Sequence, residues 1–381
     1  MQLEAIKNLF LKHKEHHLSD RYITNKNIKP LLDNLSDFCH VETIGHSVLD
    51  HPIYGVKIGT GKKKILMWSQ MHGNESTTTK ALFDLFNSFL DNDSGLQYIL
   101  EACTLYIIPI LNPDGALAYT RINANQVDLN RDAQNLTQPE SRVLRGVFES
   151  FKPDFCYNLH GQRTIFSAGT SKYSATVSFL APAQDKDCTV TPNRKVAMEV
   201  IGVMNDALQR IIPNQVGVYD DAFNLNCVGD TFQTENVPTI LFEAGHFHND
   251  YEREITRELI FISYISSLDY ISKQEVNGSV FKPYFDIPEN DKCFLDVIIR
   301  NARVEDALVD IGFQFQERLI DNKVLFFPKV EKIQQLPHVF GHKEIDANGL
   351  EVFNSKGELL KLGSENDFVI LNNEEIMLLS K

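Results

Sequence analysis

Hydrophobic and polar residues follow two different periodicities along most of the chain, and each predicts one kind of element. Apolar residues three and four positions apart predict helices at residues 2–18, 76–90, 139–151, 195–212 and 255–271. Short apolar runs bounded by turns predict buried strands at residues 62–69, 104–111, 154–159 and 239–242, with a hairpin over residues 41–60. Because such runs are typical of sheets covered on both sides, the pattern predicts an α/β fold. We expect a mixed, largely parallel central sheet with helices on both faces.

The pattern changes near residue 275. Short alternating runs recur between turn signals, at residues 294–300, 323–327 and 368–371. This pattern of short alternating runs is typical of a small β-rich unit. We therefore expect two domains, a larger one over residues 1–273 and a C-terminal β-rich domain over residues 274–381.

Composition excludes several classes of partner. Lys and Arg number 37 and Asp and Glu number 51, so the formal net charge is −14. This acidity argues against sequence-independent binding to nucleic acid and against docking on anionic lipid, which both need a cationic surface. It does not exclude a small anionic substrate, because a local cationic pocket can lie in an acidic protein.

The charged residues within the apolar runs and the spacing of the cysteines predict the cellular compartment. Charged residues break every apolar run near the N-terminus, and no run reaches the ~18 residues that a membrane helix needs. The six cysteines are scattered without a CxxC pair. We expect a cytoplasmic protein with reduced thiols. The sequence leaves the oligomeric state open.

A candidate metal site follows the strand that ends at Ser69. His72 and Glu75 are three residues apart, which brings both side chains to one point in a turn or at a helix start. Imidazole and carboxylate together suit Zn²⁺. The alternative is a turn histidine with a glutamate favoured by a helix dipole.

Two further residues lie directly at the ends of predicted buried strands. His160 ends one strand, where sites form in open α/β sheets, although a capping or core histidine is the alternative there. Glu243 follows the apolar run of residues 239–242. A carboxylate in such a place should have a raised proton affinity and is suited to general base catalysis.

A polar, turn-rich segment follows the predicted strand at residues 104–111. It places Arg121 and Arg131 next to a strand end. Arginine is suited to binding a carboxylate through two parallel hydrogen bonds. An anionic substrate is therefore compatible with the acidic composition.

The motifs form an ordered set that resembles a known family. The set is His72-x-x-Glu75, Asn112-Pro-Asp-Gly115, Arg121, Asp128-Leu-Asn130-Arg131, His160 and Phe242-Glu243. In this order they resemble the zinc carboxypeptidase (carboxypeptidase A-like) metallopeptidases. The resemblance extends over residues 40–250.

The resemblance implies a zinc hydrolase with a defined site. It implies one Zn²⁺ per chain, bound by His72, Glu75 and His160. It further implies that Asn130 and Arg131 bind the terminal carboxylate of the substrate, and that Arg121 polarises the scissile carbonyl. Glu243 would activate water and pass its proton to the leaving amine. The implied reaction is cleavage of a C-terminal amide or peptide bond next to a free carboxylate.

Two other residues are candidates for binding substrate. Tyr219 lies 24 positions before Glu243, similar to the mobile tyrosine of the family, but a core or loop tyrosine is an equal alternative. Asp230 lies near where the family sets side-chain specificity, and a turn aspartate is its alternative.

Departures from the family pattern leave the substrate open. Asp132 and Ala133 follow Arg131 where an asparagine and an aromatic residue are usual, and Glu243 precedes Ala244 rather than leucine. These differences resemble distant branches of the family, which include amidases for cell-wall peptides and deacylases of N-acyl amino acids. The alternative function is thus an N-acyl-amino-acid deacylase of the succinylglutamate desuccinylase or aspartoacylase type. An alternative from another class is an inactive relative that binds peptide C-termini.

Overall fold

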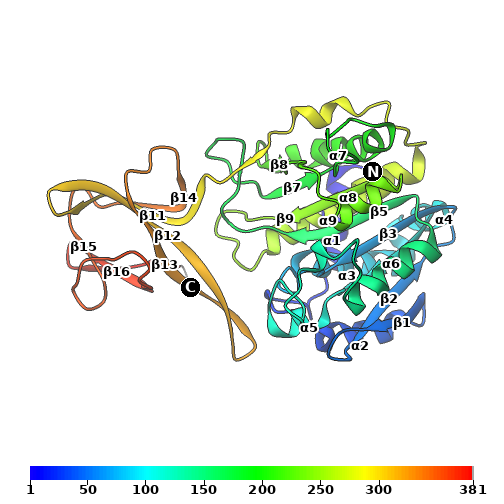
Figure 1. The fold of residues 1–381 in the computed structure, drawn as a ribbon, viewed down its shortest axis with the longest axis horizontal. Coiled ribbons are helices and arrows are strands. Elements are labelled where there is room, and N and C mark those ends of the chain that lie inside the picture. Colours follow the sequence, from blue (N-terminus) through cyan, green and yellow to red (C-terminus); the bar gives the residue numbers. More distant parts are fainter. Residues whose placement is uncertain (380–381) are drawn as a thin grey trace.

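A computed structural model describes residues 1–379 as a large α/β part followed by β sheets (Figure 1). The α/β part is built on one eight-stranded sheet. Its strands, in spatial order, are β1 (His40–His46), β2 (Pro52–Ile58), β4 (Cys103–Ile108), β3 (Lys63–Ser69), β5 (Phe155–Gly161), β9 (Thr239–Ala244), β7 (Val177–Leu180) and β8 (Val216–Val218).

The centre of this sheet is parallel and its flanks are antiparallel. Strands β4, β3, β5 and β9 run in the same direction. On one side β2 pairs antiparallel with β4 and β1 with β2, and on the other side β7 pairs antiparallel with β9. The prediction of a mixed, largely parallel sheet is confirmed.

Helices cover both faces of the sheet. They are α1 (Leu3–His13), α2 (Asn25–Leu35), α3 (Thr77–Leu90), α4 (Gln97–Ala102), α5 (Pro113–Ala118), α6 (Pro139–Phe151), α7 (Pro192–Gln209), α8 (Val228–Thr234) and α9 (Glu254–Lys273). Residues of α1, α3, α7 and α9 form one hydrophobic core, and residues of α6 and α8 form a second.

Strand β3 explains why one sheet carries two cores. Ile65 and Met67 belong to the first core, whereas Leu66 and Trp68 belong to the second. All four side chains are fully buried. Successive side chains of a strand point to opposite faces, so an uninterrupted apolar run is the signature of a strand buried on both sides.

The C-terminal residues form two further sheets. The larger has the order β13-β12-β11-β14, with β11 (Phe294–Val304), β12 (Ala307–Ile320), β13 (Lys323–Gln334) and β14 (Phe340–Asp346). The smaller contains β15 (Val352–Phe353), β16 (Phe368–Leu371) and β17 (Glu374–Met377). A separate short ladder joins β6 (Ser167–Ala168) to β10 (Asn290–Asp291). The division at residues 273 and 274 stays a prediction.

The sequence pattern missed several short elements. Strands β7 and β8 have only 4 and 3 residues, so neither is long enough to show a periodicity. Helix α2 has a buried face, but Pro30 inside it and its polar residues hide the pattern. Within residues 1–379, no helix combines the length and the apolar character that crossing a membrane requires. The cytoplasmic location stays a prediction.

A buried ion pair joins the two long helices of the first core. Arg257 on α9 donates two hydrogen bonds to Asp84 on α3, at 2.7 Å and 2.6 Å. The same guanidinium donates to the backbone carbonyls of Leu18 and Glu15. Both charged side chains are fully buried. The pair thus anchors the N-terminal segment to the helix that begins beside Glu75.

Asp84→Asn should destabilise the fold, because it removes the buried partner that accepts two hydrogen bonds from Arg257 and leaves this charge with the longer contact to Glu254, at 3.2 Å. We expect the free energy of unfolding to fall by about 3 kcal/mol. Urea unfolding followed by circular dichroism measures this loss. The matched control is Asp206→Asn, which removes the exposed partner of Arg210 on α7 and should change stability within error. Equal effects of the two variants would contradict the assigned role of the pair.

Candidate metal centre and substrate cavity

The predicted site residues come from loops and strand ends at one edge of the central sheet. His72 lies in the loop between β3 and α3, and Glu75 lies just before α3 begins. His160 is near the end of β5, and Glu243 is near the end of β9. In the parallel β5–β9 ladder His160 and Glu243 are direct register partners. Strand pairing therefore places the proposed base beside a proposed ligand.

Close backbone packing positions the loop that carries His72. A Cβ added to Gly73 would lie 1.9 Å from the carbonyl carbon of Gly115, so only glycine fits there. The Asn112 amide bridges the same two segments, donating to Met71 O at 3.2 Å and accepting from Gly115 N at 2.8 Å. The Asn-Pro-Asp-Gly motif thus holds the His-Gly-Asn-Glu motif in place.

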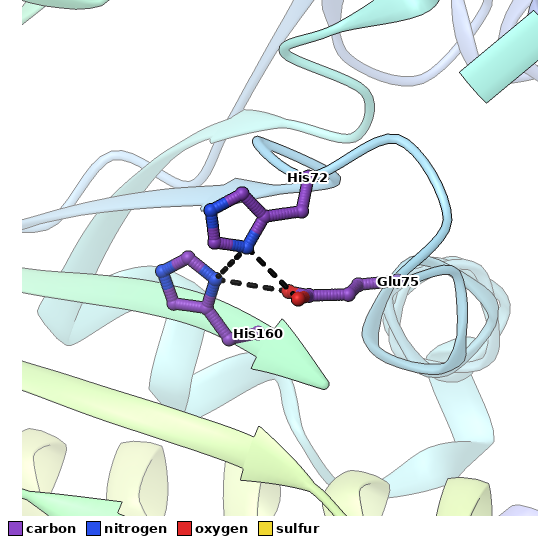
Figure 2. Close-up of side chains that lie close together, drawn as sticks. All are labelled: His72, Glu75 and His160. Atoms are coloured by element: carbon purple, nitrogen blue, oxygen red, sulfur yellow. Dashed lines mark hydrogen bonds and ion pairs between the residues drawn. The ribbon is translucent and has the colours of Figure 1, made fainter. Parts of the chain in front are cut away.

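His72, Glu75 and His160 converge on one point (Figure 2). His72 Nδ1 lies 2.8 Å from Glu75 Oε1, and His160 Nδ1 lies 3.0 Å from Glu75 Oε2. The two Nδ1 atoms are 3.1 Å apart. Ligand atoms of a tetrahedral zinc site are ~2.0–2.2 Å from the ion and hence roughly 3.4 Å from one another. The donor set and its spacing therefore fit Zn²⁺.

Burial and charge act against each other in this cluster. Burial lowers the pKa of His72, but the Glu75 and Asp128 carboxylates outweigh it and the pKa lies above its usual value. Burial also raises the pKa of Glu75, but the two histidines outweigh it and hold that pKa well below its usual range. Burial dominates at His160, whose pKa is lowered. Glu75 is thus ionised and His160 neutral at pH 7, as metal ligands must be, whereas the raised pKa of His72 means that this residue would release its proton when a metal binds.

Asp128 is a further candidate for the site, and the sequence motif gave it no role. Its Oδ1 lies 3.1 Å from His72 Nε2, and its Oδ2 accepts a hydrogen bond from Arg121 Nε at 3.0 Å. A carboxylate on the outer nitrogen of a ligating histidine fixes the tautomer and the ring orientation. The signal for it was the acidic residue that opens the Asp-Leu-Asn-Arg motif.

Arg121 connects this carboxylate to the cluster. Its Nη1 lies 3.6 Å from Glu75 Oε1. The side chain is about half exposed, at 49%. It therefore keeps donors free to reach a bound molecule beside the metal ligands.

Glu243 has the properties of a buried general base. Its Oε2 atom is buried and has no hydrogen-bond partner among residues 1–379. Burial raises the pKa of this carboxyl well above its usual value, and the charge of Glu75 raises it further. Arg121 and Arg253 act in the opposite direction. A carboxyl group with raised proton affinity beside the metal cluster is suited to moving protons.

All the residues predicted for the site line one cavity of about 900 Å³. Its lining includes His72, Glu75, Arg121, Asn130, Arg131, His160, Tyr219, Asp230 and Glu243. A volume of ~300–1,000 Å³ is typical of sites for small molecules. The structure thus brings residues from position 72 to position 243 of the chain to one place.

Asn130 and Arg131 are held at the end of the cavity next to α8. Asn130 Oδ1 accepts from Val228 N at 3.0 Å, where α8 begins. Arg131 donates to the carbonyl of Asn130 and is exposed. Its remaining donors are free for an anion.

Tyr219 and Asp230 lie on the wall of the same cavity. Tyr219 directly follows β8 and packs its ring against Phe166 at 5.2 Å between centroids. Burial raises the pKa of Tyr219, and Glu243 and Glu75 raise it further. Asp230 is in α8, is 8% exposed and accepts from Asn224 N at 3.1 Å. Burial raises the pKa of Asp230 to about 6.

The comparisons with known proteins agree with this geometry. The sequence model of a family described as "Zinc carboxypeptidase" matches residues 24–234, which is more than half of the chain. The chain belongs to the zinc carboxypeptidase family. Glu243 lies beyond the matched residues, so its place at the site comes from the β5–β9 register.

Two curated relatives match part of this chain. Carboxypeptidase SOL1 of Arabidopsis thaliana is 30% identical over 167 residues, which are 38% of this chain and 34% of that protein. Carboxypeptidase M of Mus musculus is 25% identical over 166 residues, 37% of this chain and 38% of that protein. The matches thus span little more than a third of the relatives' own length.

Solved structures share the fold of this family. A putative carboxypeptidase A from Shewanella denitrificans has a TM-score of 0.55 at 19% identity and covers 65% of this chain and 69% of its own. The carboxypeptidase A of Helicoverpa armigera has a TM-score of 0.51 at 17% identity, over 70% of this chain and 80% of its own. These likenesses support the zinc carboxypeptidase fold for the α/β part.

Asp128→Asn should weaken zinc binding, because an amide orients His72 less well than a carboxylate does. We expect the native chain to bind one zinc ion and the variant to bind it about 10–100-fold more weakly. Competition with a chelator measures both affinities. Asp220→Asn is the matched control, since Asp220 lines the same cavity but bonds only to the backbone at Ala222. An unchanged affinity in Asp128→Asn would contradict the role given to this carboxylate.

Asp230→Asn should stabilise the protein above pH 6. The pKa of Asp230 in the folded chain, about 6, lies above its value in the unfolded chain, so ionising it disfavours folding. We expect a gain of about 1–3 kcal/mol above pH 6 that disappears below about pH 4. Thermal unfolding at several pH values tests this. The exposed Asp187→Asn serves as control, and a gain that does not depend on pH would refute the assignment.

Proposed function

We propose that this protein is a zinc-dependent hydrolase that cleaves a C-terminal amide or peptide bond next to a free carboxylate. The observation that carries the proposal is the pairing of His160 with Glu243 across the β5–β9 ladder. It sets a buried carboxyl beside a cluster with the donor atoms and spacing of a zinc site. Membership of the zinc carboxypeptidase family supports the same reaction class.

The chain's own residues divide the work of such a reaction. Zinc bound by His72, Glu75 and His160 would supply a Lewis acid that lowers the pKa of water toward about 7. Glu243 takes a proton from the attacking water and delivers it to the leaving nitrogen, and its buried position favours both transfers. Arg121 donates to the carbonyl oxygen as negative charge develops there, a contribution of about 3 kcal/mol for one donor.

Substrate orientation follows from the polar groups beside α8. Arg131 and Asn130 bind the terminal carboxylate, which places the last amide bond of the substrate at the cluster. Tyr219 and Asp230 contact the rest of the leaving group from the cavity wall. This arrangement makes the enzyme an exopeptidase and gives an acidic protein a local site for an anion.

The volume of the cavity also suits a second class of substrate besides short peptides. A cavity of about 900 Å³ also accommodates an N-acyl amino acid, so a deacylase with the same chemistry is the second candidate. A peptide and an N-acyl amino acid differ only in the group that precedes the scissile amide. Hydrolysis of N-acyl amino acids but of no peptide would select the deacylase. An inactive relative would bind peptides with a free carboxylate and hydrolyse none.

Glu243→Gln should abolish hydrolysis while leaving the metal site intact. We expect kcat to fall by about 10²–10⁴-fold, because the amide cannot accept the proton. The measurement combines kcat on short peptides and N-acyl amino acids with the zinc content of each protein. Glu235→Gln, an exposed change at the end of α8, is the matched control.

The same assay tests the carboxylate requirement. Each substrate is paired with its C-terminal amide, for which we expect kcat/KM to be at least about 100-fold lower. Equal rates on acid and amide would show that Asn130 and Arg131 do not select a carboxylate. Full activity in Glu243→Gln would remove the base from the mechanism.

A further inference from the structure

The C-terminal sheet supplies part of the wall of the active-site cavity. The contributing residues are Asp296, Gln314, Phe315, Gln316, Glu317 and Phe326. Four of them are consecutive on β12, and we call residues 314–317 the strap. In Figure 1 the C-terminal sheet stands beside the α/β part. A segment that begins 154 positions after His160, the last residue of the metal cluster, thus borders the site.

One end of the strap is fixed to the rim that carries Arg121. Glu317 accepts a hydrogen bond from the Tyr119 hydroxyl at 2.7 Å and from Arg21 Nη2 at 3.2 Å. Tyr119 lies only two positions before Arg121. Arg21 is buried, with 7% of its surface exposed. A buried guanidinium needs its carboxylate partner, so this contact is costly to break.

The other end of the strap is fixed to the rim that carries His160. Gln314 Nε2 donates to Thr164 Oγ1 at 2.8 Å, and Thr164 is four positions after His160. Strand β14 of the same sheet contacts the same residue, since His342 Nε2 lies 2.8 Å from Thr164 O. Phe294 N at the start of β11 donates to Ile165 O at 3.1 Å. Several contacts therefore hold this rim.

Aromatic packing supports the strap between its two ends. The ring of Tyr251 lies 5.0 Å from that of Phe315 and 5.3 Å from that of Phe326. The Tyr251 hydroxyl donates to Asp296 Oδ1 at 3.0 Å. Tyr251 itself precedes α9 in the α/β part. The strap is thus a packed wall that spans the opening from one rim to the other.

The strap and the carboxylate site contact different elements. Asn130 and Arg131 lie against α8, whereas the strap contacts Tyr119, Thr164 and Tyr251. In the substrate orientation proposed above, the carboxylate lies at Arg131 and the scissile bond at the cluster, so the amino side occupies the rest of the cavity, whose wall includes the strap. Each additional residue of an extended chain needs about 3.3–3.6 Å of length.

We propose that the strap closes the amino side of the site and limits the substrate to a short acyl or peptidyl group before the scissile bond. The limit is about one or two residues in a cavity of this size. The inference rests on the proposed function for the orientation of the substrate. It makes residues of the C-terminal sheet determinants of substrate length, and it assigns the enzyme to small peptides and N-acyl amino acids rather than to protein C-termini.

A length series of peptides tests the proposal by binding. The peptides share one C-terminal dipeptide and grow by single residues at a blocked amino end, and calorimetry measures their Kd on zinc-loaded Glu243→Gln. We expect Kd to rise about 10-fold or more once the extension exceeds about two residues. A Kd that is the same for all lengths, or no binding at any length, overturns the inference.

Hydrolysis by the native protein separates this inference from the proposed function. Short peptides that bind but are not cleaved would refute the hydrolase and leave the length limit standing. Cleavage of short and long peptides with equal kcat/KM would refute the length limit and leave the hydrolase standing.

Variants of the strap test whether its side chains set the limit on substrate length. Phe315→Ala and Gln316→Ala shorten side chains of the wall and thus enlarge the cavity, and we expect each to reduce the Kd penalty of the long peptides by at least about 5-fold relative to the short ones. The matched control is Glu365→Gln, which removes the exposed partner of Arg318 on the same strand and should leave the length dependence unchanged. Circular dichroism checks folding, and an unchanged penalty in two folded strap variants contradicts the proposal.

Discussion

The register of three parallel strands is the constraint on which the site depends. Strands β3, β5 and β9 end at one edge of the sheet, so the residues that follow them meet there. Pairing sets His160 against Glu243, and the end of β3 beside it leads into the loop of His72. A shift of one residue in β9 would turn Glu243 to the other face, because side chains alternate along a strand. The two hydrophobic cores fix this register by burying both faces of the sheet.

Local backbone packing then refines what the strands bring together. Gly73 contacts Gly115 without a side chain between them, which sets the loop of His72 against the segment that leads to Arg121. Asp128 completes the link because it contacts His72 and Arg121 at once. The proposed metal ligands and Arg121, which would contact a substrate, are thus one connected unit. A displacement of any member changes the position of the others.

The sequence predicted the central sheet, the long helices and the candidate residues because their signals are local. Apolar runs in the sequence indicate the buried strands. Polar residues directly at the ends of these runs indicate the candidate site. The strands β7 and β8 were missed because segments of 4 and 3 residues are too short to show a periodicity. The role of Asp128 depends on a contact over 56 positions, and that of Glu317 on one over 198. No pattern within a short window records such contacts.

The distance along the chain between Tyr119 and Glu317 has a consequence for the order of assembly. Every residue of the metal cluster and its base precedes residue 244, whereas the strap begins at residue 314. Chains fold from the N-terminus during synthesis. The α/β part can therefore form its site on the ribosome with an open side, and the later docking of the C-terminal sheet closes it. Selectivity for substrate length thus arises after the residues of the metal cluster and its base have been synthesised.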